Sequence, residues 1–80
     1  MRLDKYLKVS RLIKRRTVAN DACDAGRVQV NGKVVKASYD VKEGDIIEVS
    51  YGGRTLKLRV LDVKEHALKA DASSMYEIIE

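Results

Sequence analysis

The chain has 80 residues, no proline and a formal net charge of +4, from sixteen lysine or arginine side chains against twelve aspartate or glutamate. A chain this short hides only about 60% of its unfolded surface on folding, so its core is small and leaves little room for a deep catalytic cavity. Because 45% of its residues are apolar, we expect residues 1–80 to fold as a single domain.

The cysteine content and the first residues predict a compartment. The single cysteine, Cys23, rules out an internal disulfide and gives no reason to expect an oxidising environment. Residues 1–16 carry a charge every two or three positions, so neither a signal peptide nor an apolar span of ~20 residues is expected there. The expected location is the cytoplasm, without a membrane partner.

A first helix is predicted at the start of the chain, followed by a connection and a second helix. Leu3, Tyr6 and Leu7 recur at helical spacing, which predicts an amphipathic helix from residue 2 to about residue 10. The second helix is predicted over residues 17–25, where an apolar stripe at helical spacing is made by Val18, Ala19, Ala22 and Cys23.

Capping signals support the bounds of the second helix. Thr17 is the predicted N-cap, because its hydroxyl can accept a backbone N–H bond. Gly26 can adopt the left-handed conformation that closes a helix. On its apolar stripe, Cys23 is predicted to be a small core residue.

After Gly26 the pattern changes to strand-like alternation. Val28 and Val30 alternate with polar neighbours, and Asn31-Gly32 supplies the positive φ angles of a type I′ turn. Residues 27–36 are therefore predicted to form a hairpin.

A second hairpin is predicted over residues 46–63, with Gly52-Gly53 reversing the chain. Beyond it the sequence is less periodic, although MYEII, residues 75–79, is expected to add a short edge strand. The predicted class is α+β, with two short helices packed on a small, mostly antiparallel sheet.

The positive charge is concentrated in the first half of the chain. Residues 1–36 hold ten lysine or arginine against three aspartate residues, a net +7, whereas residues 37–80 hold six against nine acids, a net −3. One basic half beside a mildly acidic half is typical of a surface that docks onto a polyanion.

Seven cations within the first sixteen residues point to nucleic acid. If they formed a solvated helix face, acids four residues away should neutralise them, but only Asp4 is so placed, as a partner for Lys8. Their mutual repulsion costs folding free energy, and a phosphate backbone relieves it. A solvated basic surface and an anionic membrane surface are the alternatives.

The missing aromatic residues favour folded RNA. The chain has no Phe or Trp, and Tyr6 lies on the apolar stripe, so stacking on single-stranded bases should be minor. Basic residues around a helix and a turn suit phosphates and 2′-hydroxyls of an RNA helix, read by shape with weak sequence specificity. A helix-turn-helix DNA binder is the alternative, but the predicted second helix would turn Asp21 and Asp24 toward the phosphates.

The ordered combination of these pieces resembles the S-four RNA-binding domain, also called the alpha-L RNA-binding motif. RLDKYL opens the first helix, Thr17 starts the second, and GRVQVNGK supplies a strand and its Asn-Gly turn. The resemblance covers a core of about residues 1–50, with the second hairpin and tail over residues 51–80.

Over its full length the chain resembles the RqcP (YabO-type) family of bacterial ribosome-associated quality-control proteins, through KVSRLIKRRT, ASYDVKEGD and the MYEII-like tail. This resemblance implies a non-catalytic adaptor, a monomer off the ribosome, that binds a large subunit obstructed by peptidyl-tRNA. It implies contacts to large-subunit ribosomal RNA and to P-site tRNA, and support of alanine tailing by a partner factor.

The family's RNA contacts map to Arg2, Asp4 and Arg16. Asp4 could orient Arg2, accept from a 2′-hydroxyl, or act as a helix-N-terminal acid paired with Lys8. Two lysines of the hairpin could extend the face or be surface decoration. The full set of predicted RNA-binding residues is Arg2, Asp4, Lys5, Lys8, Arg11, Lys14, Arg15, Arg16, Lys33 and Lys36.

Other functions are left as alternatives. A heat-shock-type ribosome-binding relative with a longer basic extension has similar chemistry, and the same module is an accessory domain in RNA-modifying enzymes. A plain protein-interaction domain is a third possibility. No metal or other cofactor is predicted, because His66 and Cys23 lack further zinc ligands, and no catalytic cluster or phosphate-binding glycine motif is recognisable.

Overall fold

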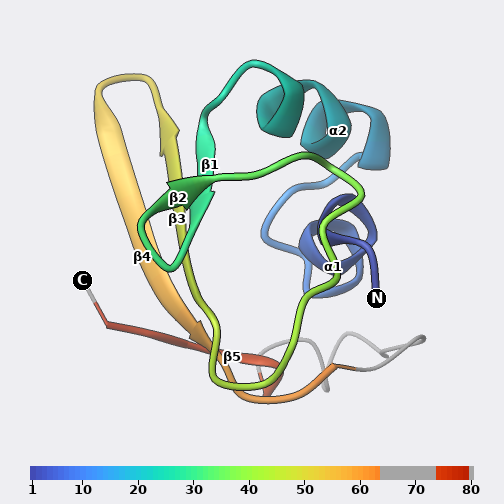
Figure 1. Ribbon diagram of the computed structural model, residues 1–80, viewed down its shortest axis with the longest axis vertical. Coiled ribbons are helices and arrows are strands. Elements are labelled where there is room, and N and C mark those ends of the chain that lie inside the picture. Colours follow the sequence, from blue (N-terminus) through green and yellow to red (C-terminus); the bar gives the residue numbers. More distant parts are fainter. Residues whose placement is uncertain (64–73, 80) are drawn as a thin grey trace.

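A computed structural model describes residues 1–63 and 74–79 and has two layers, a pair of helices against one sheet (Figure 1). The helices are α1, Leu3–Val9, and α2, Arg16–Asp24. The strands are β1, Val28–Val30, β2, Lys33–Val34, β3, Ile46–Tyr51, β4, Arg54–Val60, and β5, Tyr76–Ile78. The predicted α+β class is confirmed.

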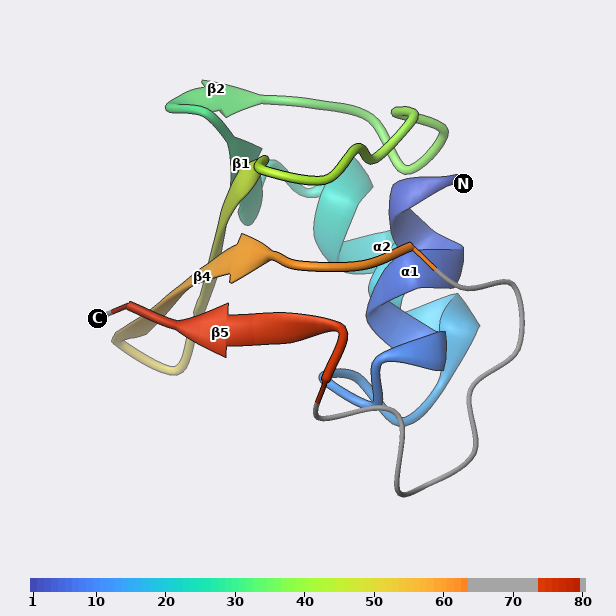
Figure 2. The same ribbon diagram turned by 90° about the horizontal axis from the view of Figure 1, so that it is seen from below.

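The five strands form one antiparallel sheet in the order β2-β1-β3-β4-β5. Asn31 and Gly32, with φ angles of 53° and 82°, reverse the chain between β1 and β2, as the type I′ prediction requires. Gly52-Gly53 joins β3 to β4, although β4 ends at residue 60 rather than 63. The predicted edge strand is β5, which pairs with β4 (Figure 2).

Helix α1 buries the predicted apolar stripe. Leu3, Tyr6 and Leu7 are completely buried in the hydrophobic core. The Tyr6 hydroxyl donates a hydrogen bond to the carbonyl of Met75 at 2.7 Å, and burial raises the pKa of this phenol. Helix α1 is thus anchored to the segment that leads into β5.

Helix α2 starts one residue earlier than predicted. Its N-cap is Arg15, in an extended conformation and without a side-chain capping bond, so the prediction of Thr17 as N-cap is wrong. Thr17 lies inside the first turn. The start of α2 is instead held from outside the helix, because Arg16 contacts the carboxylate of Asp4.

The end of α2 follows the prediction. Gly26 has a φ of 76°, its N–H donates to the carbonyl of Cys23, and the Arg27 N–H donates to the carbonyl of Ala22, both at 3.0 Å. These two bonds form a Schellman motif, in which a left-handed residue satisfies the last carbonyls of a helix.

The apolar stripe of α2 is only partly buried. Ala19 and Cys23 lie in the core, Ala22 is partly buried, and Val18 is 51% exposed. Val18 therefore belongs to the predicted stripe but does not lie in the core.

Candidate nucleic-acid interface

The start of α1 is held in place by the loop after β2. The Leu3 N–H donates to the carbonyl of Tyr39 at 2.8 Å, and the Asp4 N–H donates to the carbonyl of Ala37 at 3.2 Å. These donors belong to the first turn of a helix, where N–H groups have no intrahelical partner. The loop therefore fixes the position of the RLDKYL segment.

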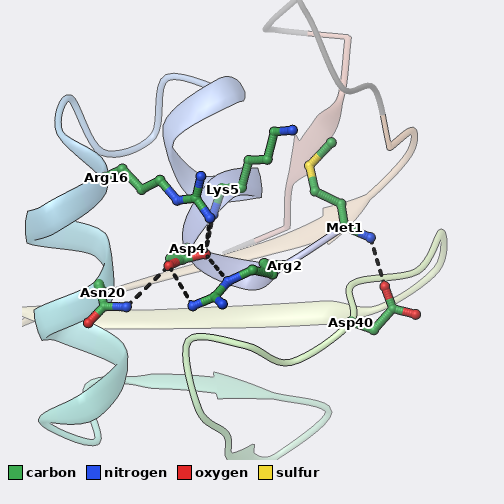
Figure 3. Close-up of polar contacts among 7 residues, drawn as sticks. All are labelled: Met1, Arg2, Asp4, Lys5, Arg16, Asn20 and Asp40. Atoms are coloured by element: carbon green, nitrogen blue, oxygen red, sulfur yellow. Dashed lines mark hydrogen bonds and ion pairs between the residues drawn. The ribbon is translucent and has the colours of Figure 1, made fainter.

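Asp4 lies at the centre of a polar cluster (Figure 3). Arg2 makes a bidentate contact with this carboxylate. Its Nε donates to Oδ1 and its Nη2 donates to Oδ2, both at 3.2 Å. Arg16 places Nη2 3.5 Å from Oδ1, and Asn20 donates from Nδ2 to Oδ2 at 3.2 Å. The Lys5 backbone N–H donates to Oδ1 at 2.7 Å. We call Asp4, Arg2, Arg16 and Asn20 the Asp4 clamp.

The clamp shields its anion and presents its cations. The Asp4 side chain is 3% exposed, whereas the side chains of Arg2 and Arg16 are 50% and 48% exposed. A guanidinium held by a carboxylate keeps further N–H donors for phosphate oxygens or hydroxyl groups. The arrangement therefore offers two oriented cations to an anionic ligand.

The surroundings of Asp4 favour its charged form. Burial alone raises its pKa, but hydrogen bonds from Arg2, Asn20 and the Lys5 backbone, together with the charge of Arg16, outweigh burial and lower the pKa below its usual value. Asp4 is thus an anion at neutral pH.

Acidification is expected to destabilise the wild type more than an Asp4→Asn variant. Because the folded-state pKa of Asp4 is lowered, its contribution is complete above the unfolded value of ~3.9 and is lost as the pH falls through the folded-state pKa. Urea unfolding between about pH 2 and pH 6 measures this difference. Glu43→Gln, at an exposed carboxylate outside the clamp, is the control for the loss of one negative charge. Identical slopes for wild type and Asp4→Asn would contradict the clamp's electrostatic role.

The predicted pair between Asp4 and Lys8 is wrong. The carboxylate points toward Arg2 and α2, and the Lys8 side chain is exposed. The alternative interpretation, in which Asp4 orients Arg2, agrees with this geometry.

Four other predicted RNA contacts lie at the end of α1 and in the connection. Lys8, Arg11, Lys14 and Arg15 are all exposed, and none forms an ion pair with a carboxylate in residues 1–63 and 74–79. Arg11 has a φ of 63°, a left-handed conformation that is uncommon for a residue with a side chain. The connection therefore presents cations whose charge the described residues leave uncompensated.

The two hairpin lysines occupy different places. Both Lys33 and Lys36 are exposed. Lys36 directly precedes Ala37, whose carbonyl accepts the Asp4 N–H, so it adjoins the clamp. Lys33 lies on β2, the edge strand, which both views place away from the start of α1 (Figures 1 and 2). Lys36 therefore lies next in the chain to a contact with the start of α1, whereas Lys33 lies on the edge strand.

The predicted site lacked two residues that organise it. Asn20 lies one helical turn after Arg16, and this i,i+4 spacing is the signal that could have placed it on the same face. Asp45 is buried and accepts hydrogen bonds from Asn31 Nδ2 at 3.2 Å and from the Tyr39 hydroxyl at 3.0 Å. Asp45 therefore connects the Asn-Gly turn to the loop that holds α1.

An ion pair also holds the loop after β2 against the start of the chain. The Met1 amino group lies 2.7 Å from Oδ1 of Asp40 (Figure 3). The hydrogen bond from this amino group, followed by its charge, lowers the pKa of the exposed Asp40 carboxyl.

The sequence offered two potential zinc ligands, Cys23 and His66. No group of three or more potential ligands that could hold a metal ion occurs in them, and His66 lies outside them. Cys23 is a buried core residue, as predicted, and burial raises the pKa of its thiol to about 11. Within the same ranges, no helix is long and apolar enough to cross a membrane.

Comparison with known proteins agrees with this fold. The model of the S4 domain matches residues 1–47, which is more than half of the chain, so the chain belongs to the S4 domain family. It is 54% identical over 79 residues to the RQC P-site tRNA stabilizing factor of Streptococcus pneumoniae, covering 99% of this chain and 90% of that protein. The Bacillus subtilis protein of the same name is 49% identical over 80 residues, covering 100% and 93%. Within the S4 proteins, the chain is thus a member of the RQC P-site tRNA stabilizing factor family, and the predicted RqcP resemblance is confirmed.

Solved structures give the same result for the fold. The chain is similar to the trimeric structure of heat shock protein 15 from Vibrio cholerae, with a TM-score of 0.90 and 26% identity. The similarity covers 98% of this chain and 80% of that chain.

Proposed function

We propose that this chain is a non-catalytic RNA-binding adaptor of bacterial ribosome-associated quality control. Its ligands are ribosomal RNA of the obstructed large subunit and the P-site peptidyl-tRNA. The observation that carries the proposal is the Asp4 clamp, which presents two oriented guanidinium groups, in a chain about half identical over its full length to proteins named for stabilizing P-site tRNA.

The mechanism is electrostatic and geometric. Arg2 and Arg16 bind phosphates, and Asp4 holds both side chains so that less conformational entropy is lost on binding. The exposed cations of the connection and Lys36 extend the contact along the RNA backbone. Recognition then depends on the shape of the RNA rather than on its sequence.

The proposal includes the setting of this activity. The adaptor acts in the cytoplasm, is a monomer off the ribosome, and steadies the tRNA while a partner factor adds alanine residues to the stalled chain. It performs no chemistry itself.

A heat-shock-type function is the second candidate, favoured by the structural similarity to heat shock protein 15. Both candidates bind large subunits through the same face. They differ in whether alanine tailing depends on the protein.

Co-sedimentation with purified large subunits tests the proposal. More protein is expected to pellet when the subunits carry P-site peptidyl-tRNA than when they are empty, because the tRNA supplies additional phosphates. Equal pelleting with and without tRNA would contradict a tRNA contact. Undiminished alanine tailing after depletion of the protein would favour the second candidate.

A further inference from the structure

A hollow lies between α2, the helix connection and the end of β3. It is a cavity of about 530 Å³, open to solvent, and its walls are mainly apolar. Cavities of about 300–1,000 Å³ with apolar walls and a few polar groups are typical of small-ligand sites. The apolar lining is made by Leu12, Ile13, Val18, Ala22, Ala25 and Val49.

Backbone hydrogen bonds join the walls of this cavity. The Ser50 N–H donates to the carbonyl of Arg27 at 2.8 Å, and the Arg27 N–H donates to the carbonyl of Ala22 at 3.0 Å. Helix α2 and β3 are therefore connected through residue 27, beside the start of β1 (Figure 1). The cavity is thus a preformed feature of the fold.

Two side chains of opposite charge, an aspartate and an arginine, line the cavity. Asp21 and Arg27 are both exposed, and neither forms an ion pair in the described ranges 1–63 and 74–79. A carboxylate accepts N–H donors, whereas a guanidinium binds anions. A ligand that matches both groups carries N–H donors on an apolar body and a negative charge close to it.

The cavity shares one lining residue with the proposed RNA interface. Asp21 also lines the shallow depression of about 290 Å³ that contains Asp4 and Arg16 of the clamp. Exposed Arg11 and Lys14 flank the lining residues Leu12 and Ile13 in the sequence. An RNA backbone on the clamp therefore passes within reach of the cavity.

We propose that this cavity binds an unpaired nucleobase of the same RNA, extruded from its helix. The base lies against Ile13 and Val18, its N–H groups donate to Asp21, and Arg27 contacts a neighbouring phosphate. Guanine is the best match, because its ring N–H and exocyclic amino group lie on the same edge and can both donate to one carboxylate. An acidic peptide would also suit the cations, but it would bring carboxylates toward Asp21. This inference rests on the proposed RNA-binding function and goes beyond it.

Two RNA hairpins test the proposal, one with a single bulged guanosine and one with an abasic bulge at the same position. Fluorescence anisotropy is expected to give about tenfold tighter binding of the guanosine hairpin to the wild type, the size of effect typical of one bidentate hydrogen-bonded base contact. Val18→Gln and Asp21→Asn should abolish this difference without weakening binding of the abasic hairpin. Ile78→Gln, at an apolar side chain of similar exposure (49%) on β5, is the control and should preserve it.

The outcomes separate this inference from the function on which it rests. Equal affinity of the wild type for both hairpins, with Arg16→Ala weakening both, would overturn the base site and leave RNA binding intact. No binding of either hairpin at low salt would count against the proposed function itself. If Val18→Gln weakens binding to large subunits but leaves the hairpin difference unchanged, the cavity holds a protein segment and the proposal is wrong.

Discussion

Raising the salt concentration from about 50 to 200 mM is expected to weaken RNA binding by roughly two to three orders of magnitude. Each phosphate that a protein cation neutralises releases condensed counterions, and this release becomes less favourable as salt rises. Residues 2–16 contain seven cations, and the Asp4 carboxylate partly offsets the charges of Arg2 and Arg16, which still face the RNA. We therefore expect about five phosphates to be neutralised.

Titrations of a short RNA hairpin at several salt concentrations measure this effect as the slope of log affinity against log salt. A flat response would contradict phosphate contacts as the source of affinity. Replacing one phosphate-binding lysine or arginine should reduce the slope by about one. The slope thus counts the contacts directly.

Replacing both clamp arginines, Arg2→Ala with Arg16→Ala, is expected to weaken binding to large subunits by about a hundredfold. One charge-assisted hydrogen bond contributes ~1.5 kcal/mol or more, which is about tenfold in affinity. Because both arginines contact Asp4, their effects should not be strictly additive, and each single variant is expected to lose more than half of the total. Co-sedimentation or anisotropy measures the loss.

The acidic half of the chain supplies a matched control. Lys57 and Arg59 of β4 are ion-paired with Glu48 and Glu77, at 3.9 and 3.3 Å. The Lys57→Ala, Arg59→Ala double variant removes the same charge and should change affinity less than about threefold. Circular dichroism shows whether both double variants are folded. An equal loss in the two would mean that net charge, and not the clamp, governs binding.

Much of the fold could be predicted because its signals are local. Strict alternation, the Asn31-Gly32 turn and the left-handed Gly26 each specify backbone geometry within a few residues, and all are found where the sequence placed them. The three-residue strand β5 was also expected, from apolar residues in an otherwise aperiodic tail.

The errors arose where distant residues decide the outcome. Thr17 has the right chemistry for an N-cap, but Asp4 contacts Arg16 from another helix and α2 starts earlier. The i,i+4 rule suggested Lys8 as the partner of Asp4, whereas the observed partners on α2 are 12 and 16 residues away. Such pairings require knowledge of how the two helices pack.

The candidate site, too, was predicted from local signals only in part. Composition and charge located the basic segment, and the family resemblance selected Arg2, Asp4 and Arg16 within it. Only the structure revealed that these three form one cluster with a buried carboxylate. It also revealed the apolar cavity, since its lining comes from segments that are far apart in the sequence.

Ultraviolet crosslinking of the protein to large subunits that carry P-site peptidyl-tRNA tests the central claim most directly. Mass spectrometry of the crosslinked peptides identifies the residues that touch RNA. If the basic N-terminal face binds RNA, the crosslinks fall within residues 2–16 and around Lys36. Crosslinks confined to the acidic half, beyond residue 40, would contradict the account.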